Sequence, residues 1–108
     1  MLSRFEIVRR LRRSGLTSFQ IRVLLTVIDI PAGETRSYRE VAEAAGRPRA
    51  YRAVGTALKL NPMPIAIPCH RVIRSDGTPG RYSAGGTRKK IALLRAERAK
   101  KRLRMSKR

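Results

Sequence analysis

The sequence has no tryptophan, one cysteine and only seven acidic residues among its 108 positions. A lone cysteine cannot form an internal disulfide, so nothing implies an oxidising compartment. No apolar run approaches the roughly 20 residues of a membrane span, which excludes an integral membrane protein. The length leaves room for one domain and excludes a two-domain enzyme with its own cofactor fold. Charged residues interrupt the apolar N-terminal positions, so we expect no secretory signal.

Basic residues outnumber acidic ones by 26 to 7, which gives a formal net charge of +19. A folded chain with this charge repels itself, and a polyanion is its natural partner. Nucleic acid is the leading candidate, because each neutralised phosphate releases counterions. An anionic membrane and ribosomal RNA remain alternatives that charge alone does not separate. The scarcity of aromatic residues argues against a stacking platform for single strands.

Two basic segments flank the apolar middle of the chain. We expect residues 1–16 to form a basic arm or short helix that ends at Gly15. Its apolar stripe is predicted to contain Leu2, Phe5, Val8 and Leu11. Residues 98–108 are expected to form a basic tail. Two interpretations of this tail stay open: a solvated segment that frays, or a set of extra phosphate contacts that adds affinity without sequence information.

Helix signals open and close the central segment, residues 17–97. Thr17 and Gln20 have the spacing of a capping box, and the apolar residues after them repeat at helical intervals, which predicts a helix over about 18–29. A closing helix is predicted over about 87–97. Its apolar face is expected to contain Ile91, Leu93 and Leu94.

Two short helices are predicted between these. Residues 37–40 have the spacing of a second capping box, which begins a helix over about 38–45, and Gly46 fits its C-terminal turn. Pro48 suits the first turn of a third helix, over about 48–60. A helix-turn-helix pair of this kind places its second helix in a DNA groove, although many similar helical pairs bind nothing. The exposed start of the second helix carries Arg47, Arg49 and Arg52.

A proline-rich stretch follows the third helix. Pro62 and Pro64 break the helix. Residues 65–67 are predicted as a short strand, 68–70 as a turn and 71–73 as extended chain. The expected fold is therefore a mostly α single domain with a short β element, of the winged helix-turn-helix type.

Cys69 lies between a proline and the only histidine of the chain. Most lone cysteines are buried structural residues, but Pro64 and Pro68 stiffen the backbone here and fix the thiol as a nucleophile requires. Neighbouring side chains in extended chain point apart, so His70 can activate the thiol only across a turn or through a water. Glu97 is a candidate to orient the imidazole, which would complete a Cys–His–Glu relay. One cysteine and one histidine are too few ligands for a metal site.

Five segments resemble the motifs of one family, in the family's order. They are Ile30–Tyr38, Arg52–Gly55, Asn61–Pro64, Ile67–Ile73 and Leu93–Glu97. The segment Ile67-Pro68-Cys69-His70-Arg71-Val72-Ile73 is similar to the active-site motif of the O6-alkylguanine-DNA alkyltransferases, also called methylated-DNA–protein-cysteine methyltransferases. The resemblance covers about residues 17–97, which it identifies as a DNA-binding and active-site domain.

The resemblance implies a suicide methyltransferase for DNA repair, in which Cys69 takes the alkyl group of O6-alkylguanine once and irreversibly. His70 would deprotonate Cys69 through a water, and Glu97 would hold His70. Asn61 would brace the turn before the active-site strand, and Tyr82 would hydrogen-bond the base. No cofactor is implied, because the cysteine is itself the acceptor.

The resemblance also implies base flipping from double-stranded DNA. Arg52 would enter the duplex in place of the flipped nucleotide, and Tyr38 would crowd the target phosphate. Further DNA contacts are expected from Ser37, Arg47 and Arg49. The alkylguanine pocket is expected to contain Met63, Pro64, Tyr82 and Ser83. The implied protein is a monomer in the cytoplasm, associated with the nucleoid and not with a membrane.

Two departures from the family keep alternatives open. Only about 16 residues precede the helix-turn-helix region, where the family often has another domain. The loop at residues 82–86 is one residue longer than in many active members and is similar to that of alkyltransferase-like proteins, which bind alkylated DNA and recruit other repair factors. In that branch the cysteine is usually replaced by tryptophan, so Cys69 favours transfer. A basic winged-helix chromatin or transcription protein with an inert cysteine is the further alternative.

Overall fold

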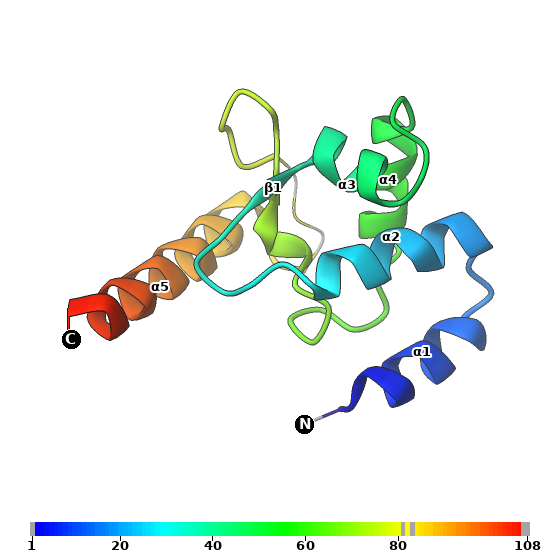
Figure 1. Cartoon of the computed structure of the whole chain (residues 1–108), viewed down its shortest axis with the longest axis horizontal. Coiled ribbons are helices and arrows are strands. Elements are labelled where there is room, and N and C mark those ends of the chain that lie inside the picture. The colour runs from blue at the N-terminus through cyan, green and yellow to red at the C-terminus, as the bar shows by residue number, and fades with distance from the viewer. Residues whose placement is uncertain (1, 81, 83, 107–108) are drawn as a thin grey trace.

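The computed structural model describes residues 2–80, 82 and 84–106. Five α-helices, one 3₁₀-helix and two short strands make up this part of the chain (Figure 1). In chain order they are α1 (Arg4–Arg12), α2 (Ser18–Ile28), β1 (Arg36–Ser37), α3 (Tyr38–Ala44), α4 (Tyr51–Lys59), η1 (Cys69–Arg71), β2 (Val72–Ile73) and α5 (Gly86–Ser106). The strands pair in parallel as a two-stranded sheet. The predicted fold class, mostly helical with a short β element, is confirmed.

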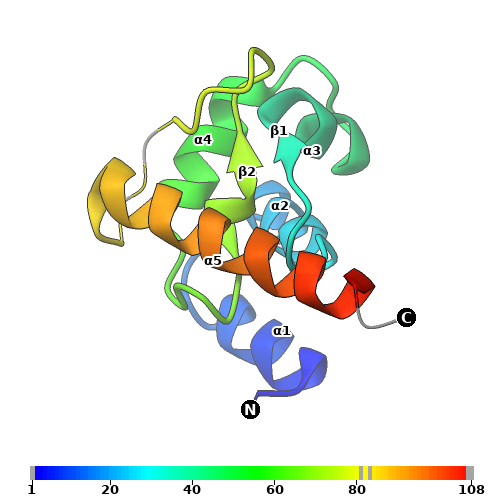
Figure 2. The same cartoon turned by 90° about the vertical axis from the view of Figure 1, so that its left-hand side faces the viewer.

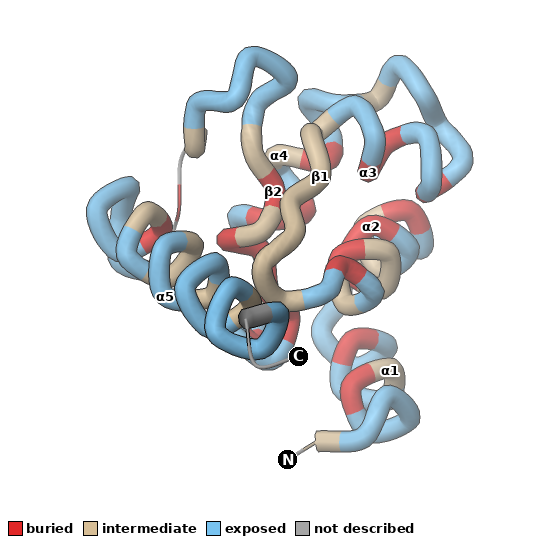
Figure 3. Tube along the Cα trace, turned by 60° about the vertical axis from the view of Figure 1, so that its left-hand side comes forward, coloured by how far each residue is buried: buried red, intermediate tan, exposed pale blue. Residues whose placement is uncertain are grey.

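Helix α2 lies at the centre of the core and contacts α1, α3, α4 and η1. Its buried residues fall at the helical spacing that the sequence predicts, and they are Phe19, Val23, Leu24 and Val27. The predicted capping box is present: Thr17 Oγ1 accepts the Gln20 N–H at 3.1 Å, and Gln20 Oε1 accepts the Thr17 N–H at 2.9 Å. Figure 3 shows buried residues gathered along α2, α4 and the β2 region, while the outer side of α5 is exposed.

The helix-turn-helix pair is formed by α3 and α4, which pack on each other and on α2. Gly46, at φ +88°, ends α3, and its N–H reaches the Glu43 carbonyl while the next N–H reaches the Ala42 carbonyl. This is the paired pattern of a Schellman motif, which requires a left-handed residue at the position of Gly46. The predicted boundary of α4 is wrong, since the helix begins at Tyr51 and not at Pro48. Residues 47–50 form a turn instead, in which the Ala50 N–H donates to the Arg47 carbonyl.

The strand predicted at residues 65–67 is absent, and a tight turn stands in its place. Ile65 has a φ of +75°, and the Ile67 N–H bonds to the Met63 carbonyl at 2.9 Å. The Asn61 side chain satisfies the Met63 N–H and the Ile67 carbonyl, so these backbone groups are used locally and not in a sheet. The turn predicted at 68–70 is present as the 3₁₀-helix η1, and extended chain begins at Val72.

The apolar stripe predicted for α1 is confirmed at Leu11, and Leu2 packs partly buried against the core, but the prediction is wrong at Phe5. Ile7 and Leu11 are buried against α2, whereas Phe5 is 70% exposed beneath the Arg9 guanidinium. Residues spaced three apart shift by about 60° around a helix at each step, so residues 2, 5, 8 and 11 cannot all lie on one face. Residues four apart, such as Ile7 and Leu11, shift by only about 40° and stay on the same face.

Helix α5 is longer than predicted and buries a different face. It starts at Gly86 and continues to Ser106, so residues 98–106 are helical. Ile91, Leu93 and Leu94 are only half-buried, and the fully buried side chain is Lys90. The helix crosses η1 and the strands (Figure 2). Among the described residues, no helix is both long and apolar enough to cross a bilayer.

We expect Thr17→Ala to lower the free energy of unfolding by about 1 kcal/mol, because it removes the oxygen that caps α2. Thermal or urea unfolding of the purified chain measures the change. Ser18→Ala, at the exposed first residue of the same helix, is the matched control and should have little effect. An equal loss in both variants would contradict the role of the cap.

Candidate active site

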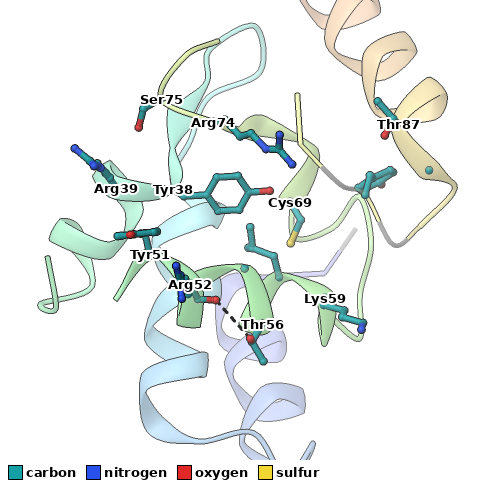
Figure 4. A pocket seen from close by; sticks show the side chains of 14 residues that line it. Tyr38, Arg39, Tyr51, Arg52, Thr56, Lys59, Cys69, Arg74, Ser75 and Thr87 are labelled. Carbon is teal, nitrogen blue, oxygen red and sulfur yellow. Dashed lines mark hydrogen bonds between the residues drawn. The ribbon is translucent and has the colours of Figure 1, made fainter. Parts of the chain in front are cut away.

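The thiol of Cys69 lies at a pocket of about 820 Å³ between α3, α4 and the start of α5. The 3₁₀-helix η1 presents Cys69 to this pocket, and side chains of α3 and α4 form the facing wall (Figure 4). The pocket is lined by Tyr38, Arg39, Tyr51, Arg52, Gly55, Thr56, Leu58, Lys59, Cys69, Arg74, Ser75, Tyr82, Gly86 and Thr87. The thiol is therefore recessed beside the second helix of the pair and open to a ligand.

Asn61 fixes the turn that carries the thiol. Its amide nitrogen donates to the Cys69 sulfur at 2.9 Å and to the Ile67 carbonyl at 3.0 Å, while its oxygen accepts the Met63 N–H at 2.8 Å. Cys69 is 7% exposed, and this burial raises the pKa of its thiol to about 12. The Asn61 donor and the charge of Lys90 act in the opposite direction. The resting thiol is thus protonated at neutral pH and needs a base.

His70 and Glu97 meet as the sequence predicts. The imidazole is 1% exposed, and its Nε2 lies 3.0 Å from Glu97 Oε1, off the line of a straight hydrogen bond. Burial acts to raise the pKa of Glu97, but the hydrogen bonds from Arg71 and the close contact with His70 outweigh it and lower the pKa below its usual value. The carboxylate therefore stays charged beside the imidazole.

Arg71 is a residue of this cluster that the sequence reasoning did not assign. Its guanidinium forks onto both oxygens of Glu97, with Nε 3.0 Å from Oε1, and its Nη1 donates to the Ile30 carbonyl at 2.8 Å. One side chain thus joins η1, α5 and the end of α2. The sequence did contain a signal for this role. Arg71 directly follows His70, which was already expected to meet a carboxylate, so an ion pair of Arg71 with the same carboxylate could have been predicted.

Lys90 is the second residue that sequence reasoning missed. It is 1% exposed, and its Nζ lies 5.9 Å from the centre of the Tyr38 ring. Burial lowers its pKa to about 8, against the influence of Cys69, which raises it. In the sequence Lys90 is hidden in the run Arg88-Lys89-Lys90. The helical spacing 90-94-97-101 would have placed it on the inward face of α5.

Two tyrosines border the thiol. Tyr38 is half-buried, and its pKa is raised mainly by burial. Gly80, at φ +75°, passes so close to it that a Cβ there would lie 2.9 Å from the Tyr38 hydroxyl. Tyr82 is buried, its ring meets His70 edge-on at 6.3 Å, and its hydroxyl has no partner among the described residues. An acceptor or donor on a ligand would satisfy this hydroxyl.

Two of the residues expected in the alkylguanine pocket do not line it. Met63 is buried in the core and does not line the pocket, because the turn after Asn61 points it inward. Pro64 is exposed in the same turn and also does not line it. Ser83 lies outside the described residues.

The residues expected to contact DNA lie on or beside the α3–α4 pair. Arg47, Arg49 and Arg52 are exposed, and Arg52 is at the edge of the pocket. Arg47 also stacks over the Phe19 ring at 4.8 Å. The hydroxyl oxygen of Ser37 caps α3 by accepting the Glu40 N–H, which leaves its O–H free to donate. No group of three metal-ligating side chains occurs within residues 2–80, 82 and 84–106.

Comparisons with known proteins agree with this geometry. The sequence model of a family described as "6-O-methylguanine DNA methyltransferase, DNA binding domain" matches residues 18–99. The methylated-DNA–protein-cysteine methyltransferase of Methanosarcina barkeri is 55% identical over 69 residues, 64% of this chain and 44% of that protein. The chain spans about half the length of the curated relatives it matches.

Two solved structures are similar in fold and sequence. A Mycobacterium tuberculosis OGT in complex with DNA has a TM-score of 0.75 and 49% identity, over 78% of this chain and 51% of that one. Atl1 of S. pombe, in complex with damaged DNA containing O6-carboxymethylguanine, has a TM-score of 0.66 and 33% identity, over 76% of this chain and 77% of that one.

We expect Lys90→Met to slow the alkylation of Cys69 by iodoacetamide several-fold at pH 7, because the buried cation favours the thiolate. The deficit should shrink as pH rises above about 8, where Lys90 loses its proton in the parent chain and no longer helps. Intact mass against time, across a pH series, measures both effects.

Lys89→Met is the matched control, since this neighbour is exposed and the variant has the same charge change. It should retain the parent rate at every pH. Equal rates for Lys90→Met and the parent chain below pH 8 would contradict the electrostatic role of Lys90.

Proposed function

The chain belongs to the 6-O-methylguanine DNA methyltransferase family, and from this premise we propose that it repairs DNA directly, by moving an alkyl group from O6-alkylguanine to Cys69. The observation that carries the proposal is the recessed thiol in a pocket beside α4, held by Asn61 with His70 and Glu97 behind it. A structural cysteine needs neither an open pocket nor a carboxylate–imidazole pair.

Base flipping follows from the depth of the thiol. The O6 atom of a stacked guanine cannot reach a sulfur that is 7% exposed at a pocket, so the nucleotide must leave the duplex. Flipping costs a few kcal/mol, and least where alkylation has already weakened the pair. Arg52, exposed at the edge of the pocket on α4, is suited to fill the space that the nucleotide leaves.

The transfer is a displacement at the alkyl carbon. His70 takes the thiol proton through a water, with Glu97 stabilising the imidazolium that forms. The thiolate then attacks the alkyl carbon, the carbon–O6 bond breaks, and its electron pair stays on the guanine. The Tyr82 hydroxyl, which lacks a partner in the described structure, is a suitable donor to the departing oxygen. The thioether product is not hydrolysed, so each molecule acts once and needs no cofactor.

Double-stranded DNA is the proposed partner, bound through the α3–α4 pair. Arg47, Arg49 and the free O–H of Ser37 supply phosphate contacts there, and Tyr38 lies where it would crowd the target phosphate. We propose a monomer, because one chain contains the thiol, its base and the basic face.

A second candidate is a protein that binds alkylated DNA without repairing it. The similarity to S. pombe Atl1, solved in complex with damaged DNA, favours it. The cysteine at position 69, set against Asn61 and coupled to Lys90, favours transfer.

The deciding experiment incubates the chain with a duplex containing O6-methylguanine and reads the intact mass. We expect one added methyl group, about 14 Da, located on Cys69 by peptide mapping and absent in Cys69→Ala. Tight, selective binding of the damaged duplex with no mass change would support the second candidate. Equal affinity for damaged and undamaged DNA, with no transfer, would contradict both candidate functions.

We expect Arg52→Ala to slow methyl transfer at least ten-fold in duplex DNA and much less in single strands, because only the duplex requires the space to be filled. Rates are measured by quench-flow at saturating DNA, where a loss of DNA affinity no longer affects the observed rate. Arg49→Ala, proposed as a phosphate contact alone, is the control and should match the parent chain at saturation. Equal slowing by Arg52→Ala on both substrates would contradict the proposal that Arg52 fills the space left by the flipped nucleotide.

A further inference from the structure

A second basic surface lies away from the α3–α4 pair, and we call it the rear surface. It comprises the exposed basic residues of the last turns of α5. They are Arg98, Lys100, Arg102 and Arg104. No acidic residue occurs anywhere in residues 98–108. The last turns of α5 also run beyond residue 99, where the family match ends.

One side chain of the last turns of α5 packs against the loop between α2 and β1. The Nζ of Lys101 lies 4.0 Å from Glu34 Oε2, and its chain runs against Gly33. In Figure 1 the last turns of α5 lie at the left-hand edge of the molecule, whereas α4 lies on the right. The rear surface is therefore well separated from the helices that we propose to hold the first duplex.

The last turns of α5 pack little against the rest of the protein. Apart from Lys101, the side chains of residues 98–105 are exposed. Arg98 and Arg102, and likewise Lys100 and Arg104, are like charges four residues apart, and such pairs destabilise a helix. A bound polyanion would remove this repulsion.

The pattern fits nucleic acid better than a lipid surface. An interfacial helix needs one continuous apolar face. Leu103 and Met105, the exposed apolar residues here, are two positions apart and point about 200° from each other around the helix. The basic side chains likewise lie on two sides of α5, so these turns have no continuous apolar face.

We infer that the rear surface binds the phosphate backbone of a second DNA segment while α3 and α4 hold the first. The chain would then bridge two duplexes, or two distant parts of one DNA molecule. The inference rests on the proposed function only for the first duplex. Binding of the second DNA segment depends on charge alone, so it has no sequence preference and weakens steeply as the salt concentration rises.

The test is a bridging assay in which one undamaged duplex is fixed to beads and a second, fluorescent duplex is captured through the protein. We expect capture by the parent chain at 50 mM salt and at least a five-fold loss in the double variant Arg102→Gln, Arg104→Gln. The matched control, Arg88→Gln with Lys89→Gln, removes two exposed charges from the other end of α5 and should keep bridging. Helix content by circular dichroism verifies that both variants fold.

The outcomes separate this inference from the proposed function, because methyl transfer is read by mass in the same samples. Transfer without bridging by the parent chain, or equal bridging by the two double variants, would overturn the inference alone. Bridging without transfer would overturn the repair proposal alone. Binding of phosphatidylserine vesicles that depends on Arg102 and Arg104, with no bridging, would assign the rear surface to lipid and overturn the inference.

Discussion

The desolvation of the Cys69 thiol is the constraint on which the rest of the site depends. Burial places the sulfur within reach of a ligand in the pocket and away from bulk water, but it also raises the thiol pKa to about 12. A thiolate in such a place forms only where donors and cations offset the lost hydration. The Asn61 amide and the buried Lys90 both act in that direction. In the reaction that we propose, the thiol therefore stays protonated until His70 takes its proton.

Arg71 links this chemistry to the architecture. Its contacts with Glu97 and with the Ile30 carbonyl fasten α5 and the end of α2 to the 3₁₀-helix that carries the thiol. Three segments far apart in sequence are therefore joined within two residues of Cys69. The same helix α5 supplies Lys90 to the pocket, Glu97 to His70 and the last turns to the rear surface. Without this link, the position of the imidazole would depend on α5 packing alone.

Local signals in the sequence were sufficient where the determining atoms are neighbours in the chain. The capping boxes at Thr17 and Ser37 predicted the starts of α2 and α3, and the left-handed glycine after α3 predicted its end. The prediction failed at residues 65–67, because the Asn61 side chain, four or more residues away, takes over the backbone hydrogen bonds. The start of α4 was wrong for a similar reason, since a hydrogen-bonded turn competes with the helix preference of Pro48.

The site was predictable to the extent that residue chemistry and family resemblance indicated it. His70 and Glu97 meet, and Cys69 opens to the pocket, whereas Met63 and Pro64 do not line it. Lys90 was missed because burial of a lysine depends on the packing of α5, which a run of three basic residues does not reveal.

The brace at Asn61 has a consequence for the chemical ageing of the protein. Conversion of this amide to a carboxylate would remove both N–H donors and place a negative charge against the sulfur, which would raise the thiol pKa further. The usual route to that damage is attack on the amide by the backbone nitrogen of the following residue. Here the following residue is Pro62, whose nitrogen has no hydrogen to lose. The one asparagine of the chain is thus set where the cyclic imide that begins its decay cannot readily form.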